Sequence, residues 1–157
     1  MTVYNYSMYQ TQPSLSLLSH HQAVKRLRLP VFATAVRAGF PSPAEDFIER
    51  RIDLNDLVQH KEATFFAWVE GESMQDFGIH HGDLLMIDKS LQAEIGDIVV
   101  AETDGLFTVK KLGRGVLLAG NPAFAPIPID PDTGVLVWGV VVRVIHDMRQ
   151  RKTRRKI

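Results

Sequence analysis

The chain has 157 residues, of which 45% are hydrophobic and 23% charged, so it is long enough for one domain with a substantial core. It contains no cysteine, which excludes disulfides, thiolate metal sites and a cysteine nucleophile. No stretch approaches the ~20 apolar residues of a membrane helix. The N-terminal residues also do not show the basic segment and apolar core of a secretory signal. We therefore expect a cytoplasmic protein.

The zero net charge conceals a separation of charge along the chain. Basic and acidic side chains number 18 each, but residues 1–44 contain no acid. Six basic side chains lie in the last nine residues, so residues 1–148 carry 12 basic and 18 acidic side chains. A basic tail can attract nucleic acid or an acidic partner, although many such tails are simply solvated. The tail residues are Arg149, Arg151, Lys152, Arg154, Arg155 and Lys156.

The first part of the chain predicts an arm followed by an extended segment. Residues 1–29 show no sustained hydrophobic period, and we expect them to be mobile. Extended backbone should begin at Leu29–Pro30, because a residue before proline avoids the helical region. It continues to Ala38 and Gly39. Extended strands are the form in which many sites bind peptide backbones.

A helix is predicted next. Ser42 fits the N-cap, Pro43 the first helical position and Glu45 the capping box. A second cap at Asp53 should precede a short turn that contains Leu57 and Val58. The apolar stripe of the helix would be formed by Phe47, Ile48 and Ile52.

From residue 63 onward the sequence predicts strands. Short runs rich in β-branched and aromatic residues alternate with Gly, Asp, Asn and Pro. Asp104–Gly105 is a strong signal for a two-residue hairpin. The fold class is therefore mainly β with a small helical entrance. The predicted strands are Phe65–Val69, Asp83–Asp88, Asp97–Glu102, Leu106–Leu112, Val116–Ala119 and Val135–Ile145.

The turn Gly71–Asp76 carries a candidate nucleophile. Ser73 follows an apolar run, but a serine hydroxyl is a poor nucleophile unless a base takes its proton. Lysine can be that base only where burial lowers its pKa. Lys110 and Lys111 both lie in a later strand, and strand alternation does not decide which of them turns inward. By itself the serine also fits an ordinary turn.

Other chemistries find weaker support in the sequence. His80–His81 with Asp76 and Asp83 match no metal-ligand spacing, and His20–His21 do not either. No glycine-rich phosphate loop is present. We therefore expect neither a metal nor a cofactor. The residues before the β region do not offer the two periodic helices of a helix-turn-helix.

Several motifs together resemble the LexA/UmuD-type family of serine peptidases, in which UmuD is the self-cleaving subunit of error-prone DNA polymerase V. The similarity runs from about Phe32 to Arg149, with the motifs in the same order and at nearly the same spacing. It implies a strand-rich peptidase domain preceded by a mobile, cleavable arm. The motifs are Ala38–Ala44, Arg51–Asn55, Gly71–Met74, Asp83–Leu85, Gly96–Val99 and Asp104–Leu112.

The resemblance also implies roles for particular residues. Ser73 would be the nucleophile and Lys110, rather than Lys111, the general base. The backbone amides of Ser73 and Met74 would be candidate oxyanion donors. Cleavage between Ala38 and Gly39 would remove residues 1–38 as an arm. Residues 39–157 would remain as the peptidase and polymerase-accessory domain, with the basic tail from about Arg149.

The partners implied by the resemblance are a RecA filament on single-stranded DNA, a UmuC-type polymerase subunit and a second copy of the chain. The residue before the expected cut is Ala38. LexA has alanine at this position too, whereas some UmuD proteins have cysteine. Residues 1–17 and the basic tail have no counterpart in the family. We expect the tail to contact DNA or the polymerase. A non-cleaving binding module and a LexA-type repressor are the alternatives, and a signal-peptidase relative would need a membrane anchor.

Overall fold

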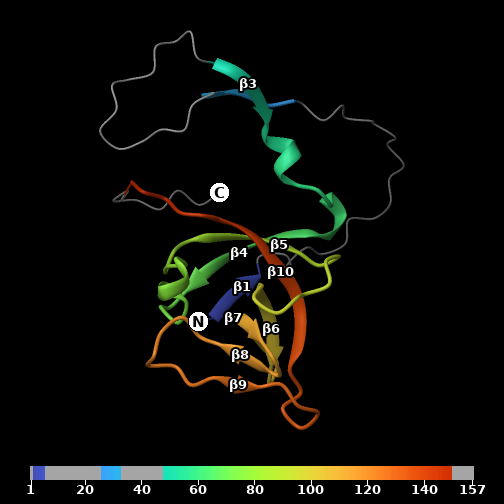
Figure 1. Cartoon of the computed structure of the whole chain (residues 1–157), viewed down its shortest axis with the longest axis vertical. Coiled ribbons are helices and arrows are strands. Elements are labelled where there is room, and N and C mark those ends of the chain that lie inside the picture. Colours follow the sequence, from blue (N-terminus) through green and yellow to red (C-terminus); the bar gives the residue numbers. More distant parts are fainter. Residues whose placement is uncertain (1, 6–25, 33–47, 150–157) are drawn as a thin grey trace, which may run out of the picture. The chain divides into compact units, whose positions relative to one another are not determined.

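The computed structural model describes residues 2–5, 26–32 and 48–149 (Figure 1). The protein is mainly β, which confirms the predicted fold class. The chain forms two compact units, Gln12–Lys61 and a larger one made of Met1–Thr11 and Glu62–Ile157. Among the described residues, no helix has the length and apolar character needed to cross a membrane.

The smaller unit contains a β-hairpin. Strand β2 (Arg28–Phe32) pairs antiparallel with β3 (Ile48–Asp53), and the 3-10 helix η3 (Leu54–Leu57) follows directly. The carboxylate of Asp53 accepts a hydrogen bond from the amide of Asn55 at 3.0 Å and so caps η3. The predicted cap at Asp53 and the extended segment at Leu29 are therefore confirmed.

The predicted helix is wrong where the structure describes it. Ile48–Asp53 forms strand β3 instead, paired with β2. Isoleucine is a β-branched residue type that suits a strand, and pairing with β2 overrides the helical period predicted for this segment. Residues 42–47, with the capping box, lie outside the described residues.

A single antiparallel sheet makes up most of the larger unit. Its strand order is β1-β4-β5-β10-β6-β7-β8-β9, and β1 also pairs with β7, so the sheet closes on itself (Figure 1). Two 3-10 helices, η4 (Lys61–Ala63) and η5 (Gln75–Phe77), accompany it. The strands are β1 (Thr2–Asn5), β4 (Thr64–Glu70), β5 (Leu84–Asp88), β6 (Ile98–Thr103), β7 (Leu106–Gly113), β8 (Val116–Leu118), β9 (Ile127–Pro128) and β10 (Leu136–Ile145).

All the strands predicted after residue 63 are present, with ends that agree or differ by one residue. Asp104 and Gly105 have φ of 51° and 75°, the left-handed values that a tight two-residue hairpin turn needs. Besides β3, two strands were not predicted. Thr2–Asn5, expected to be part of a mobile arm, forms β1 against β4, and Ile127–Pro128 forms the short β9.

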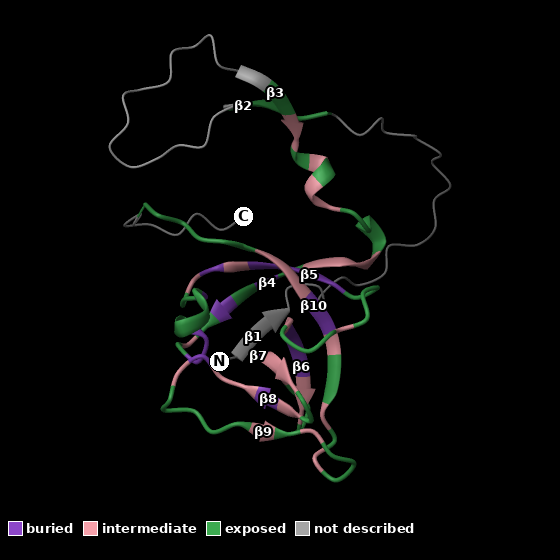
Figure 2. Cartoon of the chain, in the orientation of Figure 1, coloured by how far each residue is buried: buried purple, intermediate pink, exposed green. Residues whose placement is uncertain are grey.

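Buried residues lie along several strands of the sheet (Figure 2) and form two hydrophobic clusters. Trp138 of β10 packs edge-on against Phe65 and Phe107, with ring centroids 5.2 and 5.4 Å away. The turn after β4 contributes Met74, which is fully buried. The main buried cluster comprises Ala67, Val69, Met74, Ile79, Leu85, Ile87, Val100 and Val109.

Candidate active site

Ser73 lies in the turn that follows β4, and its residue is fully buried. Gly71 has φ of 89°, a left-handed conformation that glycine adopts without strain as the chain leaves the strand. The Ser73 carbonyl accepts a hydrogen bond from the amide of Gly120 at 2.7 Å, and the amide of Asp76 donates to the Gly120 carbonyl at 2.8 Å. These two bonds hold the turn against the loop after β8.

Close packing at Gly120 reinforces this contact. A Cβ at position 120 would lie 2.6 Å from a ring carbon of Phe77, so a larger residue requires the Phe77 ring or the turn to shift. The side-chain amide of Asn121 donates a further hydrogen bond to the carbonyl of Glu72 at 3.1 Å. The position of Ser73 therefore depends on a loop nearly fifty residues away in the sequence.

Lys110 lies beside Ser73. Its Nζ donates to Ser73 Oγ at 3.2 Å, to Thr108 Oγ1 at 3.0 Å and to the carbonyl of Val109 at 3.0 Å. These contacts use all three protons of an ammonium. Only 4% of Lys110 is exposed, and burial lowers its pKa below the ordinary value of 10.5. In the described part of the chain, no carboxylate forms an ion pair with it.

The two adjacent lysines differ in their surroundings. Lys111 is half-buried, and its Nζ lies 5.0 Å from the centre of the Phe77 ring. Strand alternation failed to separate the lysines because Thr108, Val109 and Lys110 are all buried, so both faces of β7 are covered at this point. A strand that is covered on both faces lacks the buried-exposed alternation of a one-sided strand.

The remaining predicted residues fall into two groups. Within the described part of the chain, the structure shows no acceptor for the amide of Ser73 or of Met74. Ala38 and Gly39 lie outside the described residues.

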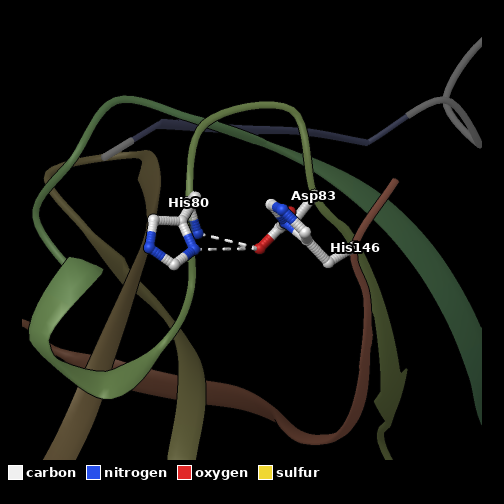
Figure 3. Close-up of side chains that lie close together, drawn as sticks. All are labelled: His80, Asp83 and His146. Atoms are coloured by element: carbon white, nitrogen blue, oxygen red, sulfur yellow. Dashed lines mark hydrogen bonds and ion pairs between the residues drawn. The ribbon is translucent and has the colours of Figure 1, made fainter. Parts of the chain in front are cut away.

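A second polar cluster in the same unit contains His80, Asp83 and His146 (Figure 3). The sequence predicts ordinary turn residues here, because their spacing matches no metal-ligand pattern. The structure brings His146 to Asp83, which the sequence did not predict, since the two are 63 residues apart. Asp76, which was considered with them, instead donates its amide to Gly120.

Comparison with known proteins agrees with this fold and site. Residues 30–142 match the family model described as peptidase S24-like. The chain is 43% identical over 128 residues to protein ImpA of Escherichia coli, which covers 77% of this chain and 86% of that protein. It is 40% identical over 142 residues to protein SamA of Salmonella typhimurium, covering 86% and 97%.

A more distant relative is the LexA repressor of Ectopseudomonas mendocina. It is 38% identical over 123 residues, covering 75% of this chain and 60% of the repressor. The chain therefore belongs to the peptidase S24-like family, which confirms the predicted family.

Proposed function

We propose that this protein is a self-cleaving serine peptidase in which Lys110 activates Ser73. The observation that carries the proposal is the 3.2 Å contact between Lys110 Nζ and Ser73 Oγ in a buried site where no carboxylate among the described residues pairs with the lysine. A lysine beside a carboxylate would stay charged, whereas burial alone favours the neutral amine. The neutral amine has a lone pair that can accept the serine proton.

The chemistry follows from these atoms. Neutral Lys110 takes the proton of Ser73 as Oγ attacks the carbonyl carbon of Ala38. The amides of Ser73 and Met74 donate hydrogen bonds to the oxyanion that forms. Lys110 then returns the proton to the nitrogen of Gly39, and the peptide bond breaks. Water hydrolyses the resulting ester of Ala38 on Ser73, with Lys110 again acting as base.

The small residues at the cut fit a buried nucleophile. Ala38 and Gly39 present little side-chain bulk, so an extended backbone can approach Ser73 closely. Cleavage would separate residues 1–38 from residues 39–157. Because the substrate is part of the same chain or of a second copy, one turnover per chain is sufficient.

We further propose that the shortened chain is a homodimeric accessory subunit of an error-prone DNA polymerase in the SOS response to DNA damage. The similarity to ImpA and SamA and the resemblance to UmuD support this role. A RecA filament on single-stranded DNA would stimulate the cut by raising the fraction of arms docked at Ser73. A UmuC-type catalytic subunit would then bind the product in the cytoplasm.

The test is mass spectrometry of purified protein incubated with RecA, single-stranded DNA and a nucleotide, beside Ser73→Ala and Lys110→Ala. The proposal predicts one cut, after Ala38, that is absent in both variants. An intact wild type would favour a non-cleaving binding module. A cut that persists in Ser73→Ala would mean a different nucleophile or a contaminating protease.

The basic tail from Arg149 has a separate proposed role as a contact for DNA or the polymerase. Its six basic side chains favour binding that weakens with salt. Deleting residues 149–157 should remove salt-dependent DNA binding in a gel-shift assay. Binding that is unchanged by the deletion would refute a DNA contact.

A further inference from the structure

The cluster of His80, Asp83 and His146 joins two distant parts of the larger unit. His80 and Asp83 lie in the turn between η5 and β5, and His146 is the first residue after β10. Both imidazoles lie beside the Asp83 carboxylate (Figure 3). His146 Nδ1 contacts Asp83 Oδ1, and His80 Nδ1 lies 3.9 Å from Oδ2.

Burial makes the Asp83 carboxylate unusual. Only 1% of the residue is exposed, and charged carboxylates are rarely so buried without a paired cation. Within the described residues, the groups that pair with it are the two imidazoles and the amide of His80, which donates to Oδ2 at 2.8 Å. Arginine and lysine are absent from this set. The side chains that face the carboxylate are therefore imidazoles, which can bind a metal ion, rather than permanent cations.

We propose that these three side chains form a site for a divalent transition-metal ion of the Zn²⁺ type. Imidazole and carboxylate together favour such ions, whereas Mg²⁺ and Ca²⁺ prefer oxygen ligands alone. Three protein ligands leave at least one position for water. The proposal does not depend on the peptidase activity.

The geometry is close to what an ion needs. One ligand atom from each residue lies within 4.8 Å of the other two. Bonds of about 2.1 Å in a tetrahedral site place ligand atoms roughly 3.4 Å apart. The largest separation must therefore shorten by at most about 1.4 Å, and the direct contact between His146 and Asp83 must open to admit the ion. The side chains of His80 and His146 are 53% and 45% exposed and can rotate, while that of Asp83 is 2% exposed and stays fixed.

The position of the site gives metal binding a structural consequence. The carbonyl of Asp83 accepts a hydrogen bond from Val69 at 2.8 Å, at the end of the strand that leads to the turn of Ser73. An ion would link the turn between η5 and β5 to the end of β10, which lies more than sixty residues later in the chain. Because only the folded chain brings the three ligands together, binding should stabilise the fold.

The experiment is a titration of the full chain, without a polyhistidine tag, with Co²⁺ and then Zn²⁺. The Ser73→Ala background keeps the chain at one length. We expect one Co²⁺ per chain with the visible absorption of a low-coordinate site, its loss on adding Zn²⁺, and a melting temperature that rises with Zn²⁺. Mg²⁺ should have none of these effects.

Variants locate the ion among the six histidines of the chain. His80→Gln and His146→Gln should each weaken binding at least about 100-fold, since even the loss of an outer hydrogen-bond partner of a ligand costs 10–100-fold. The matched control is His81→Gln, an exposed neighbour outside the cluster, which should bind as tightly as the parent.

Two results would overturn the proposal. Absence of a Co²⁺ spectrum would leave the cluster as a hydrogen-bonded His–Asp–His group only. Equal affinity in the parent and in His80→Gln would place the ion on other histidines. If His146→Gln fails to fold, His80→Gln decides the matter alone, because its backbone hydrogen bond to Asp83 does not involve the substituted side chain.

Discussion

The larger unit holds two buried polar groups whose surroundings are opposite. Lys110 is a buried base whose polar partners are the neutral groups of Ser73, Thr108 and Val109. Asp83 is a buried acid between two imidazoles, which can carry a proton or bind a cation. Neutral partners leave Lys110 free to lose its charge, whereas the imidazoles place two nitrogen ligand atoms beside the Asp83 carboxylate. The first arrangement favours proton transfer and the second favours binding.

The largest expected effect is on the lysine pair. Lys110→Ala should slow self-cleavage by roughly 10²–10⁴-fold, because a positioned general base contributes about that much. Lys111→Ala should change the rate less than about twofold, since Lys111 lies over Phe77 rather than beside Ser73. The rate is followed by the appearance of the fragment of residues 39–157. Equal slowing by the two substitutions would contradict the assignment.

Gly120→Ala should show how the position of Ser73 affects the cleavage rate, apart from the effect of lower stability. Its Cβ would clash with Phe77 and displace the turn, and a displacement of about 1 Å can slow a reaction by around 10²-fold. Overpacking should also cost about 1–3 kcal/mol of unfolding free energy.

The matched control for Gly120→Ala is Gly139→Ala in β10, whose Cβ would lie 2.7 Å from Ile87. This substitution should destabilise the fold to a similar extent but leave the cleavage rate of the folded protein nearly unchanged. Stability is measured by urea unfolding and cleavage by mass spectrometry. Cleavage that slows equally in both variants would show that general destabilisation explains the effect.

Lys110→Met tests the cost of burying the charge. The folded-state pKa of Lys110 lies below its unfolded value, so the unfolded chain binds more protons between the two. Wild-type stability should therefore rise with pH through this window. The difference in stability between the variant and the wild type should therefore depend on pH and move in favour of the wild type as pH approaches 10.5. A difference that is independent of pH would contradict the lowered pKa of buried Lys110.

The smallest expected effect concerns β1, which pairs with β4 and touches β7. Deleting residues 2–5 would leave backbone groups of β4 without partners, and each lost hydrogen bond costs about 1 kcal/mol. Hydrogen exchange should therefore become faster for amides of β4 but not for those of β6 or β10. Unchanged exchange in β4 would show that the strand adds no protection.

The sequence predicted local features well and long-range ones poorly. The strands after residue 63 and the turn at Asp104 depend on nearby residue types, and the structure has them. The helix predicted through Ile52 failed because its residues pair with β2, and β1 was missed because its partners lie over sixty residues away.

The same limit applies to the two polar groups. The resemblance selected Lys110. Because both faces of β7 are covered at this point, no periodic pattern in the sequence indicates that this lysine is buried. His146 had no signal at all, because its approach to Asp83 depends on the pairing of β10 with β5. Local rules therefore place candidate residues in turns and strands, while the closed sheet decides which of them meet.

The most direct test of the central claim is an NMR titration of the Lys110 ammonium in the Ser73→Ala variant. Burial predicts that Lys110 titrates below the ordinary lysine pKa of 10.5. The cleavage rate of the wild type should rise with pH through the same midpoint and then level off, because only neutral Lys110 can take the proton. A Lys110 pKa at or above 10.5 would contradict its role as the base.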